Sequence, residues 1–187
     1  AAATAPPWDA ERGAKAPSRP VAFARGRVGD PDRARRKVRG YEPATLDALF
    51  AAGTFEWLLV KADGARRREF KAPGEDEPVV PSRSTDVVVV ASVRAVGAPN
   101  EAPAVHRPDR VASLVGRGVG DDLTAADVGA VLARDAGGLK HVPAGARAHL
   151  LVNKADTPGL RETARAVVDA ARARTDRFET CLVASLA

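Results

Sequence analysis

The sequence has 187 residues, which is enough for one folded domain with its own hydrophobic core. Its 45% of hydrophobic residues argues against a disordered chain, and its longest apolar run, Val87 to Ala91, is too short to cross a bilayer. The formal charge of +5 is compatible with a nucleic-acid partner, but no aromatic residues are interleaved with the arginine clusters as base stacking requires, so we expect none.

The first third of the chain predicts few elements. Residues 1–20 are rich in Ala and Pro and predict an irregular N-terminal segment. Residues 21–24 favour a short strand. A helix is predicted over 43–52, because Pro43 suits the first helical turn and Gly53 ends the apolar pattern.

Two strands and two helices are predicted in the middle of the chain. Residues 57–60 form an apolar run without polar alternation, which is typical of a strand buried on both faces of a parallel sheet, and residues 86–93 form a second one. Helices are predicted over 107–115 and 124–134. Thr124 is a good N-cap for the second helix, with an acid three residues later as in a capping box.

The last third continues this alternation. A strand is predicted over 148–152, a helix that opens with Thr157 and Pro158, and a strand over 178–184. Strands that alternate with helices predict an α/β fold with a mainly parallel sheet and helices on both faces. We expect one such domain over residues 21–187.

The most informative motif is Asn153-Lys154-Ala155-Asp156, directly after a predicted strand and before a helix. In open parallel sheets, ligands bind at this edge. The pattern N-K-x-D is the one with which GTPases recognise guanine: the Asp carboxylate accepts from the base N1–H and exocyclic amine, the Asn amide reaches the N7 side, and the Lys stem lies along the nucleotide. The alternative is that Asn153 and Asp156 only cap the following helix.

Asp63-Gly64 is a second candidate, at the end of the predicted strand over 57–60. An acidic residue at this position holds Mg²⁺ through water in phosphate-binding proteins, and Gly64 would allow the backbone to approach a γ-phosphate. A simple turn remains the alternative, because Asp-Gly is common turn chemistry.

Several motifs are absent from the sequence. It contains no G-x-x-x-x-G-K-[ST], so backbone N–H groups and a lysine for the β- and γ-phosphates are missing. The chain as given is therefore not expected to hydrolyse nucleotides, and we assign no catalytic residue. His141 and His149 have no ligand spacing with Cys181, which argues against a Cys/His metal site.

A series of further segments resembles one known family in motif and order. The segments are Ala62-Asp63-Gly64-Ala65-Arg66, Phe70-Lys71-Ala72-Pro73-Gly74-Glu75, Glu77-Pro78-Val79-Val80-Pro81, Val105-His106-Arg107-Pro108, Gly120 to Val131, Gly137 to Arg147, and Asn153 to Asp156. They resemble the accessory proteins of selenium-dependent molybdenum hydroxylases, of the YqeC type. Seven matches in the right order are far more specific than any one of them.

The resemblance implies a P-loop NTPase-like fold that is incomplete at the N-terminus of this chain, since family members begin with a strand and a Gly-rich loop. Lys61 stands where the family usually has Glu, which leaves Asp63 alone to carry the metal site. The resemblance also implies a family-specific surface near the phosphate end of the nucleotide. Its residues are Gly64, Arg66, Lys71, Glu75, Glu77, His106 and Arg107. For His106 a locally satisfied ring at a helix start, and for Lys71 a solvated or salt-bridged lysine, are the alternatives.

Together these features predict a nucleotide-binding accessory protein that takes Mg²⁺ with GTP or ATP. Asn153, Lys154 and Asp156 would bind the base and Asp63 the metal. The expected partners are the nucleotide and a molybdenum hydroxylase or its cofactor, with no membrane. The lone cysteine and the lack of a signal-peptide pattern predict a cytoplasmic location. Nucleotide hydrolysis is expected only of a complete protein with a P-loop. The alternative is a non-catalytic interaction module that keeps the fold.

Overall fold

The computed structural model describes residues 21–28, 37–53 and 55–186. The chain divides into two compact units, Ala1–Val60 and Lys61–Ala187, whereas the sequence predicted one domain over residues 21–187. The expected irregular segment over residues 1–20 lies outside the described residues.

The first unit contains a strand pair and a helix. Strands β1 (Gly26–Val28) and β2 (Lys37–Arg39) pair antiparallel, and helix α1 spans Pro43–Ala51. The helix begins with its proline as predicted and ends before Gly53, whose φ of +69° is unfavourable for residues with a side chain. Residues 21–24 are not in a strand, so that prediction is wrong by a few residues.

The predicted strand over residues 57–60 is also wrong. These residues form no strand, and the side chains of Trp57 and Leu59 are 80% and 90% exposed. An apolar run becomes a buried strand only if neighbouring strands accept its backbone hydrogen bonds and cover its side chains. No such neighbour exists for this run among the residues that the structure describes.

The second unit is built on a three-stranded parallel sheet in the order β4-β6-β7. Strand β4 spans Asp86–Ser92, β6 spans Arg147–Asn153 and β7 spans Phe178–Val183, close to their predicted bounds. A separate parallel pair consists of β3 (Phe70–Lys71) and β5 (Val105–His106), which the sequence did not predict. The α/β class and the mainly parallel pairing are confirmed.

Three helices and one 3-10 turn connect these strands. The 3-10 turn η1 (Val93–Ala95) follows β4, and helices α2 (Pro108–Val115) and α3 (Ala125–Leu132) precede β6. Helix α3 has the predicted capping box: Thr124 accepts from the Asp127 N–H, and Asp127 accepts from the Thr124 N–H. Helix α4 (Pro158–Arg172) then leads to β7, with Thr157 as its N-cap.

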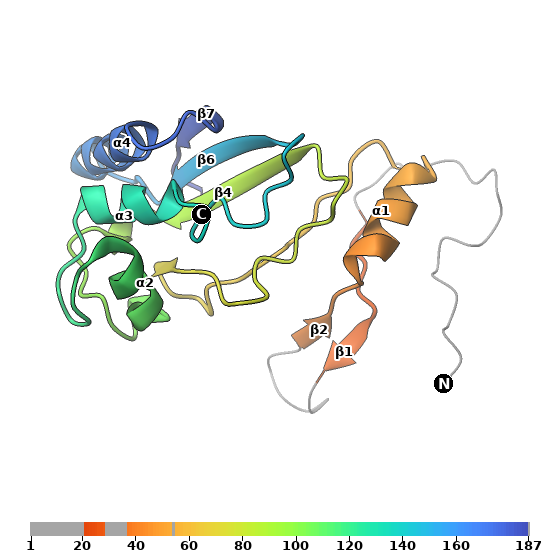
Figure 1. The fold of residues 1–187 in the computed structure, drawn as a ribbon, viewed down its shortest axis with the longest axis horizontal. Helices are drawn as coiled ribbons and strands as arrows, with labels where there is room; N and C mark the ends of the chain where they lie inside the picture. Colours follow the sequence, from red (N-terminus) through yellow and green to blue (C-terminus); the bar gives the residue numbers. More distant parts are fainter. Residues whose placement is uncertain (1–20, 29–36, 54, 187) are drawn as a thin grey trace. The chain divides into compact units, whose positions relative to one another are not determined.

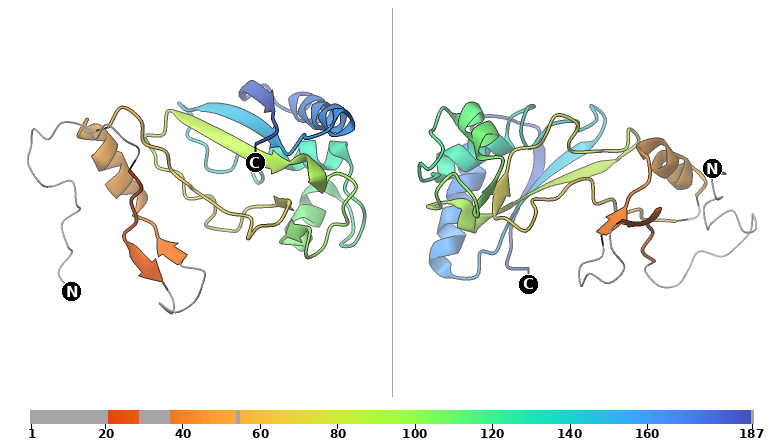
Figure 2. Two further views of the ribbon diagram at one scale, coloured as in Figure 1. Left: turned by 180° about the vertical axis from the view of Figure 1, so that it is seen from behind. Right: turned by 90° about the horizontal axis from the view of Figure 1, so that it is seen from below.

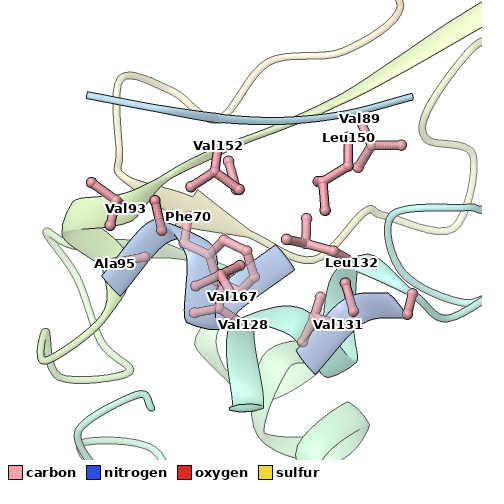
Figure 3. Close-up of a cluster of buried hydrophobic side chains, with 14 of the residues drawn as sticks. Phe70, Val89, Val93, Ala95, Val128, Val131, Leu132, Leu150, Val152 and Val167 are labelled. Carbon is pink, nitrogen blue, oxygen red and sulfur yellow. The ribbon is translucent and has the colours of Figure 1, made fainter. Parts of the chain in front are cut away.

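The core of this unit lies between the sheet and helices α3 and α4, which lie on one side of the strands in Figures 1 and 2. Figure 3 shows Val89, Leu150 and Val152 of the strands facing Val128, Leu132 and Val167 of the helices. The packed strand residues alternate along the sequence because successive side chains point to opposite faces of a sheet. One face of the sheet is therefore tightly covered.

The opposite face of the sheet carries exposed apolar side chains. Val88 and Val90 of β4 and Leu182 of β7 are 54%, 59% and 53% exposed. The prediction of helices on both faces is therefore not met: no described element of this unit covers these side chains. None of the described helices is both long and apolar enough to cross a membrane.

Candidate functional site

The Asn153–Asp156 tetrad follows β6 directly and meets the segment that follows β7. The Asp156 Oδ1 accepts from the Ser185 hydroxyl at 2.6 Å, and the Asn153 Oδ1 accepts from the Leu186 N–H at 2.8 Å. The Ala155 N–H also donates to the Ala184 carbonyl at 2.9 Å. Because β6 and β7 are parallel neighbours, their carboxyl ends bring these two segments to the same edge of the sheet. We call this edge the rim.

The tetrad does not cap the following helix. The N-cap of α4 is Thr157, whose hydroxyl accepts from the Leu160 N–H at 3.3 Å. The capping alternative for Asn153 and Asp156 is therefore wrong. Instead, their side chains connect the two segments that follow β6 and β7.

Lys154 makes an ion pair rather than lying free at the rim. Its ammonium donates to both carboxylate oxygens of Glu69, at 2.8 and 2.9 Å, from a backbone with φ of +63°. Burial raises the pKa of Glu69, but the bonds from Lys154 and Ser92 and the charge of Arg94 outweigh it, so the net pKa is lowered. Glu69 precedes β3, and this ion pair links β3 to the rim.

Arg94 completes the rim from the end of β4. Its Nη2 donates to the Asp156 Oδ2 at 2.7 Å. The Ser185 hydrogen bond, together with Arg94, lowers the pKa of Asp156. Asp156 is therefore ionised at neutral pH, with each carboxylate oxygen already holding one donor.

Asp63 lies in a loop rather than at the end of a strand. Its carboxylate forms an ion pair with Lys71, and the Lys71 ammonium also contacts the Glu77 Oε2 at 3.0 Å and the Gly64 carbonyl at 3.2 Å. The structure thus agrees with the alternative prediction that Lys71 is a salt-bridged lysine, and its three N–H groups have three oxygen acceptors. The side chain of Lys71 is only 15% exposed.

Asp63, Lys71, Glu77 and Arg107 form a second cluster beside the rim residues, and Glu77 is at its centre. It accepts two bonds from the Arg107 guanidinium, at 2.7 and 3.0 Å, and one from the Gly74 N–H at 3.3 Å. The Arg107 hydrogen bonds are the main cause that lowers the pKa of Glu77 to about 2, while partial burial opposes it. A Cβ at Gly74 would lie 2.9 Å from the Arg107 Nη2, so a side chain there would require the guanidinium to shift.

Further cations hold the backbone carbonyls of residues 72–78, which we call the clamp loop. Lys140 donates to the Gly74 carbonyl at 2.6 Å and also to that of Glu75, and Arg110 donates to that of Pro73 at 3.4 Å. The His141 Nδ1 lies 2.9 Å from the Pro78 carbonyl. The Glu75 side chain itself points to solvent. The carbonyls of the clamp loop are therefore bonded by side chains from distant parts of the chain.

His106 and Arg107 stand where β5 meets α2. His106 is 8% exposed and pairs with Lys71 in the strand register. Burial, and then the charges of the surrounding cations, lower the pKa of His106, so its ring is neutral at neutral pH. Arg66 is one of these cations; it is exposed, has φ of +52°, and has no carboxylate partner among the described residues.

The structure thus forms two neighbouring groups from the predicted site residues. Asn153 and Asp156 lie at the rim, and Asp63, Lys71, Glu77 and Arg107 form the second cluster. Lys154 connects them through Glu69, which directly precedes β3, the strand that contains Lys71. Glu69, Arg94, Lys140 and Ser185 were missed by sequence reasoning. Arg94 and Ser185 follow predicted strands at their carboxyl ends, and that position was a usable signal.

A metal ion would find few protein ligands here. The described residues contain no group of three or more His, Cys, Asp or Glu side chains placed to hold one. Asp63 offers a single carboxylate that already pairs with Lys71. This set suits only a Mg²⁺ ion that takes its remaining ligands from phosphate oxygens and water.

These features define an α/β protein with charged loops at the carboxyl edge of parallel strands. Comparison with known proteins identifies its family. The chain matches the model of the family described as YqeC protein over residues 11–109, and it belongs to that family. The match contains the second cluster but ends before the tetrad.

One curated relative is the protein described as "Uncharacterized protein YqeC" from Escherichia coli (strain K12). It is 33% identical over 118 residues, which cover 63% of this chain and 46% of the relative. The matched region thus spans less than half of the length of that relative. No solved structure matches the chain.

Proposed function

We propose that this chain binds a purine nucleotide at the rim, as part of an accessory protein for the maturation of selenium-dependent molybdenum hydroxylases. The observation that carries the proposal is the junction of the segments after β6 and β7, where the partly buried Asn153 and the exposed Asp156 lie beside Ser185 and Leu186. A P-loop NTPase-like fold is part of the proposal.

The Asp156 carboxylate has the capacity that base recognition needs. A carboxylate accepts about four hydrogen bonds. Only two donors, Ser185 and Arg94, reach it among the described residues, and its side chain is 41% exposed. Its lowered pKa keeps it ionised, so it is an acceptor for the N–H groups of guanine. Asn153 holds Leu186, and we assign it to positioning the two segments around the base.

The phosphates and Mg²⁺ would lie toward the second cluster. Lys154 and Glu69 lead from the rim to β3, and Lys71 and His106 stand at the carboxyl ends of β3 and β5. Arg66 has a free guanidinium for a phosphate oxygen. Asp63 would hold Mg²⁺ through water, which requires the Lys71 ammonium to shift toward Glu77.

Calorimetric titration of the chain with GDP and ADP, with and without Mg²⁺, tests the proposal. We expect binding that falls by at least about tenfold in Asp156→Ala, because hydrogen bonds to a charged group are lost. Asp169→Ala is the matched control, since it removes an exposed carboxylate from helix α4 without touching the rim. Nucleotide binding that is absent, or that is equal in Asp156→Ala, would contradict the proposal.

A second candidate is an interaction module without nucleotide turnover, with a molybdenum hydroxylase as its partner. The exposed apolar face of the sheet at Val88, Val90 and Leu182 favours it, because large exposed apolar patches mark interaction sites. The double substitution of Val88 and Val90 by Ser should then abolish the complex, while Asp156→Ala leaves it intact. The reverse result would exclude this candidate.

A further inference from the structure

Arg94 occupies the carboxylate on which base recognition depends. It lies in η1, directly after β4, and its backbone N–H donates to the Ser92 hydroxyl at 3.2 Å. From there its Nη2 reaches the Asp156 Oδ2 at 2.7 Å. Both side chains are about half-exposed, at 53% for Arg94 and 41% for Asp156, so solvent and solutes reach the pair.

The charge of Arg94 also acts on a second carboxylate, that of Glu69. Glu69 is paired with Lys154, and the charge of Arg94 contributes to lowering its pKa. Arg94 therefore lies in the field of two carboxylates, Asp156 and Glu69. If Arg94 leaves Asp156, its guanidinium still lies in the electrostatic field of the Glu69 carboxylate, which reduces the cost of the displacement.

The guanidinium group resembles the donor edge of one purine only. It is planar and presents adjacent N–H donors to a carboxylate. Guanine presents the same pattern through its N1–H and exocyclic amine, whereas the N1 of adenine is an acceptor. A guanine edge can therefore take the place of Arg94 on Asp156, and an adenine edge cannot.

We propose that Arg94 is a specificity-determining residue of the rim: its guanidinium holds Asp156 Oδ2 in the free protein and must be displaced by a guanine base. This inference rests on the proposed function. Arg94 thus competes with guanine nucleotides and does not compete with adenine nucleotides for the carboxylate. With Arg94 in place, the ratio of guanine to adenine nucleotide affinity is therefore smaller than it would be with Asp156 alone.

The expected size of the effect follows from the exposure of the pair. Exposed ion pairs contribute little, so displacing Arg94 costs a factor of no more than about five in affinity. We expect Arg94→Ala to raise the affinity for GDP by about three- to fivefold and to leave or lower that for ADP. Arg94→Lys should lie between Arg94→Ala and the wild type, because lysine keeps the charge but not the planar donor edge.

The experiment titrates the chain with fluorescent GDP and ADP derivatives in wild type, Arg94→Ala and Arg94→Lys. Arg161→Ala is the control, since it removes one exposed positive charge near the start of helix α4 and contacts neither carboxylate. Carboxyl NMR adds a second readout: the pKa of Asp156 should rise in Arg94→Ala. A ratio of GDP to ADP affinity that is unchanged or lower in Arg94→Ala overturns the inference.

The failure of this inference differs from failure of the proposed function. Suppose that wild type binds nucleotide and Asp156→Ala does not, but the ratio of GDP to ADP affinity is the same in wild type and the Arg94 variants. Then only the role of Arg94 is refuted. If the wild type and both Arg94 variants bind neither nucleotide, the nucleotide site itself falls, and the role of Arg94 with it.

Discussion

The rim and the clamp loop use the same kinds of charged residue in opposite ways. At the rim, Asp156 and Arg94 meet at a surface where both are about half-exposed. In the second cluster, which holds the clamp loop, the Lys71 side chain is only 15% exposed, and Glu77 accepts from two cations and a backbone N–H. At the rim, the Asp156 carboxylate can accept further hydrogen bonds. In the second cluster, the Glu77 carboxylate already accepts four hydrogen bonds from Arg107, Lys71 and Gly74.

This difference separates binding from stability. A carboxylate with spare lone pairs can receive a ligand, while one that holds a loop together contributes to folding. The family match contains the clamp loop and ends before the tetrad. The motif Lys71-Ala72-Pro73-Gly74-Glu75 is therefore best explained as the framework that positions Asp63 and Arg107.

The largest expected effect on stability comes from Glu77→Ala. It leaves Arg107, Lys71 and the Gly74 N–H without their shared acceptor. We expect the free energy of unfolding to fall by about 1–2 kcal/mol, a value reduced because Glu77 is 35% exposed. Urea unfolding measures it, and Asp156→Ala should show no comparable loss. Equal losses in the two variants would remove the distinction between the two regions.

The pH dependence of stability tests the same carboxylate without removing it. The pKa of Glu77 is about 2 in the folded protein against an ordinary 4.5, so the unfolded chain takes up the proton first as the pH falls. Its contribution is complete above pH 4.5 and is lost as the pH falls towards 2. The free energy of unfolding of Glu77→Gln, measured by urea unfolding at a series of pH values, should therefore change less with pH in this window than that of wild type. Asp86, whose pKa the Arg147 hydrogen bond also lowers, titrates in both proteins and cancels in the comparison.

A smaller effect is expected from Lys71→Met. The substitution removes the ammonium between Asp63 and Glu77 but leaves the Arg107 bonds intact. We expect a loss of about 1 kcal/mol and a Mg²⁺-dependent rise in melting temperature that wild type lacks, because Asp63 then has no cation beside it. Thermal unfolding with and without Mg²⁺ measures both. If Mg²⁺ has no effect on the variant, Asp63 does not form a cation site.

The smallest effect is expected from Ser185→Ala. Ser185 is the main cause that lowers the pKa of Asp156, so the substitution should move this pKa up towards the ordinary value of 3.8. Global stability should not change measurably, because both side chains are exposed. Carboxyl NMR titration detects the shift. An unchanged pKa would mean that the Ser185 hydroxyl does not hold Asp156 in solution.

The sequence predicted the second unit better than the first. Residues 86–93, 148–152 and 178–184 were recognised as strands because their apolar runs do become packed neighbours in one sheet. The capping of α3 and the start of α4 were also local signals of sequence. The run at Trp57 had an equally strong apolar signal, but no described strand pairs with it, and its prediction as a strand is wrong.

The sequence allowed only some of the candidate site residues to be predicted. The tetrad could be found because four consecutive residues formed a pattern. Ser185 and Arg94 are 29 and 62 positions away from Asp156, and no local pattern connects them. The same holds for Lys140, which reaches the Gly74 carbonyl across 66 positions.

By itself, the sequence determined the α/β class, the principal helices and strands of the second unit, and the family, because hydrophobic period, caps and ordered motifs are local properties of the chain. Tertiary structure alone decided which charged groups are fully engaged in ion pairs and hydrogen bonds within the protein and which can still accept hydrogen bonds from a ligand. Glu77 accepts from Arg107, Lys71 and the Gly74 N–H, while Asp156 has two donors and keeps free lone pairs. The reason is that ion pairing and exposure depend on which distant segments the fold brings together at the carboxyl ends of its parallel strands.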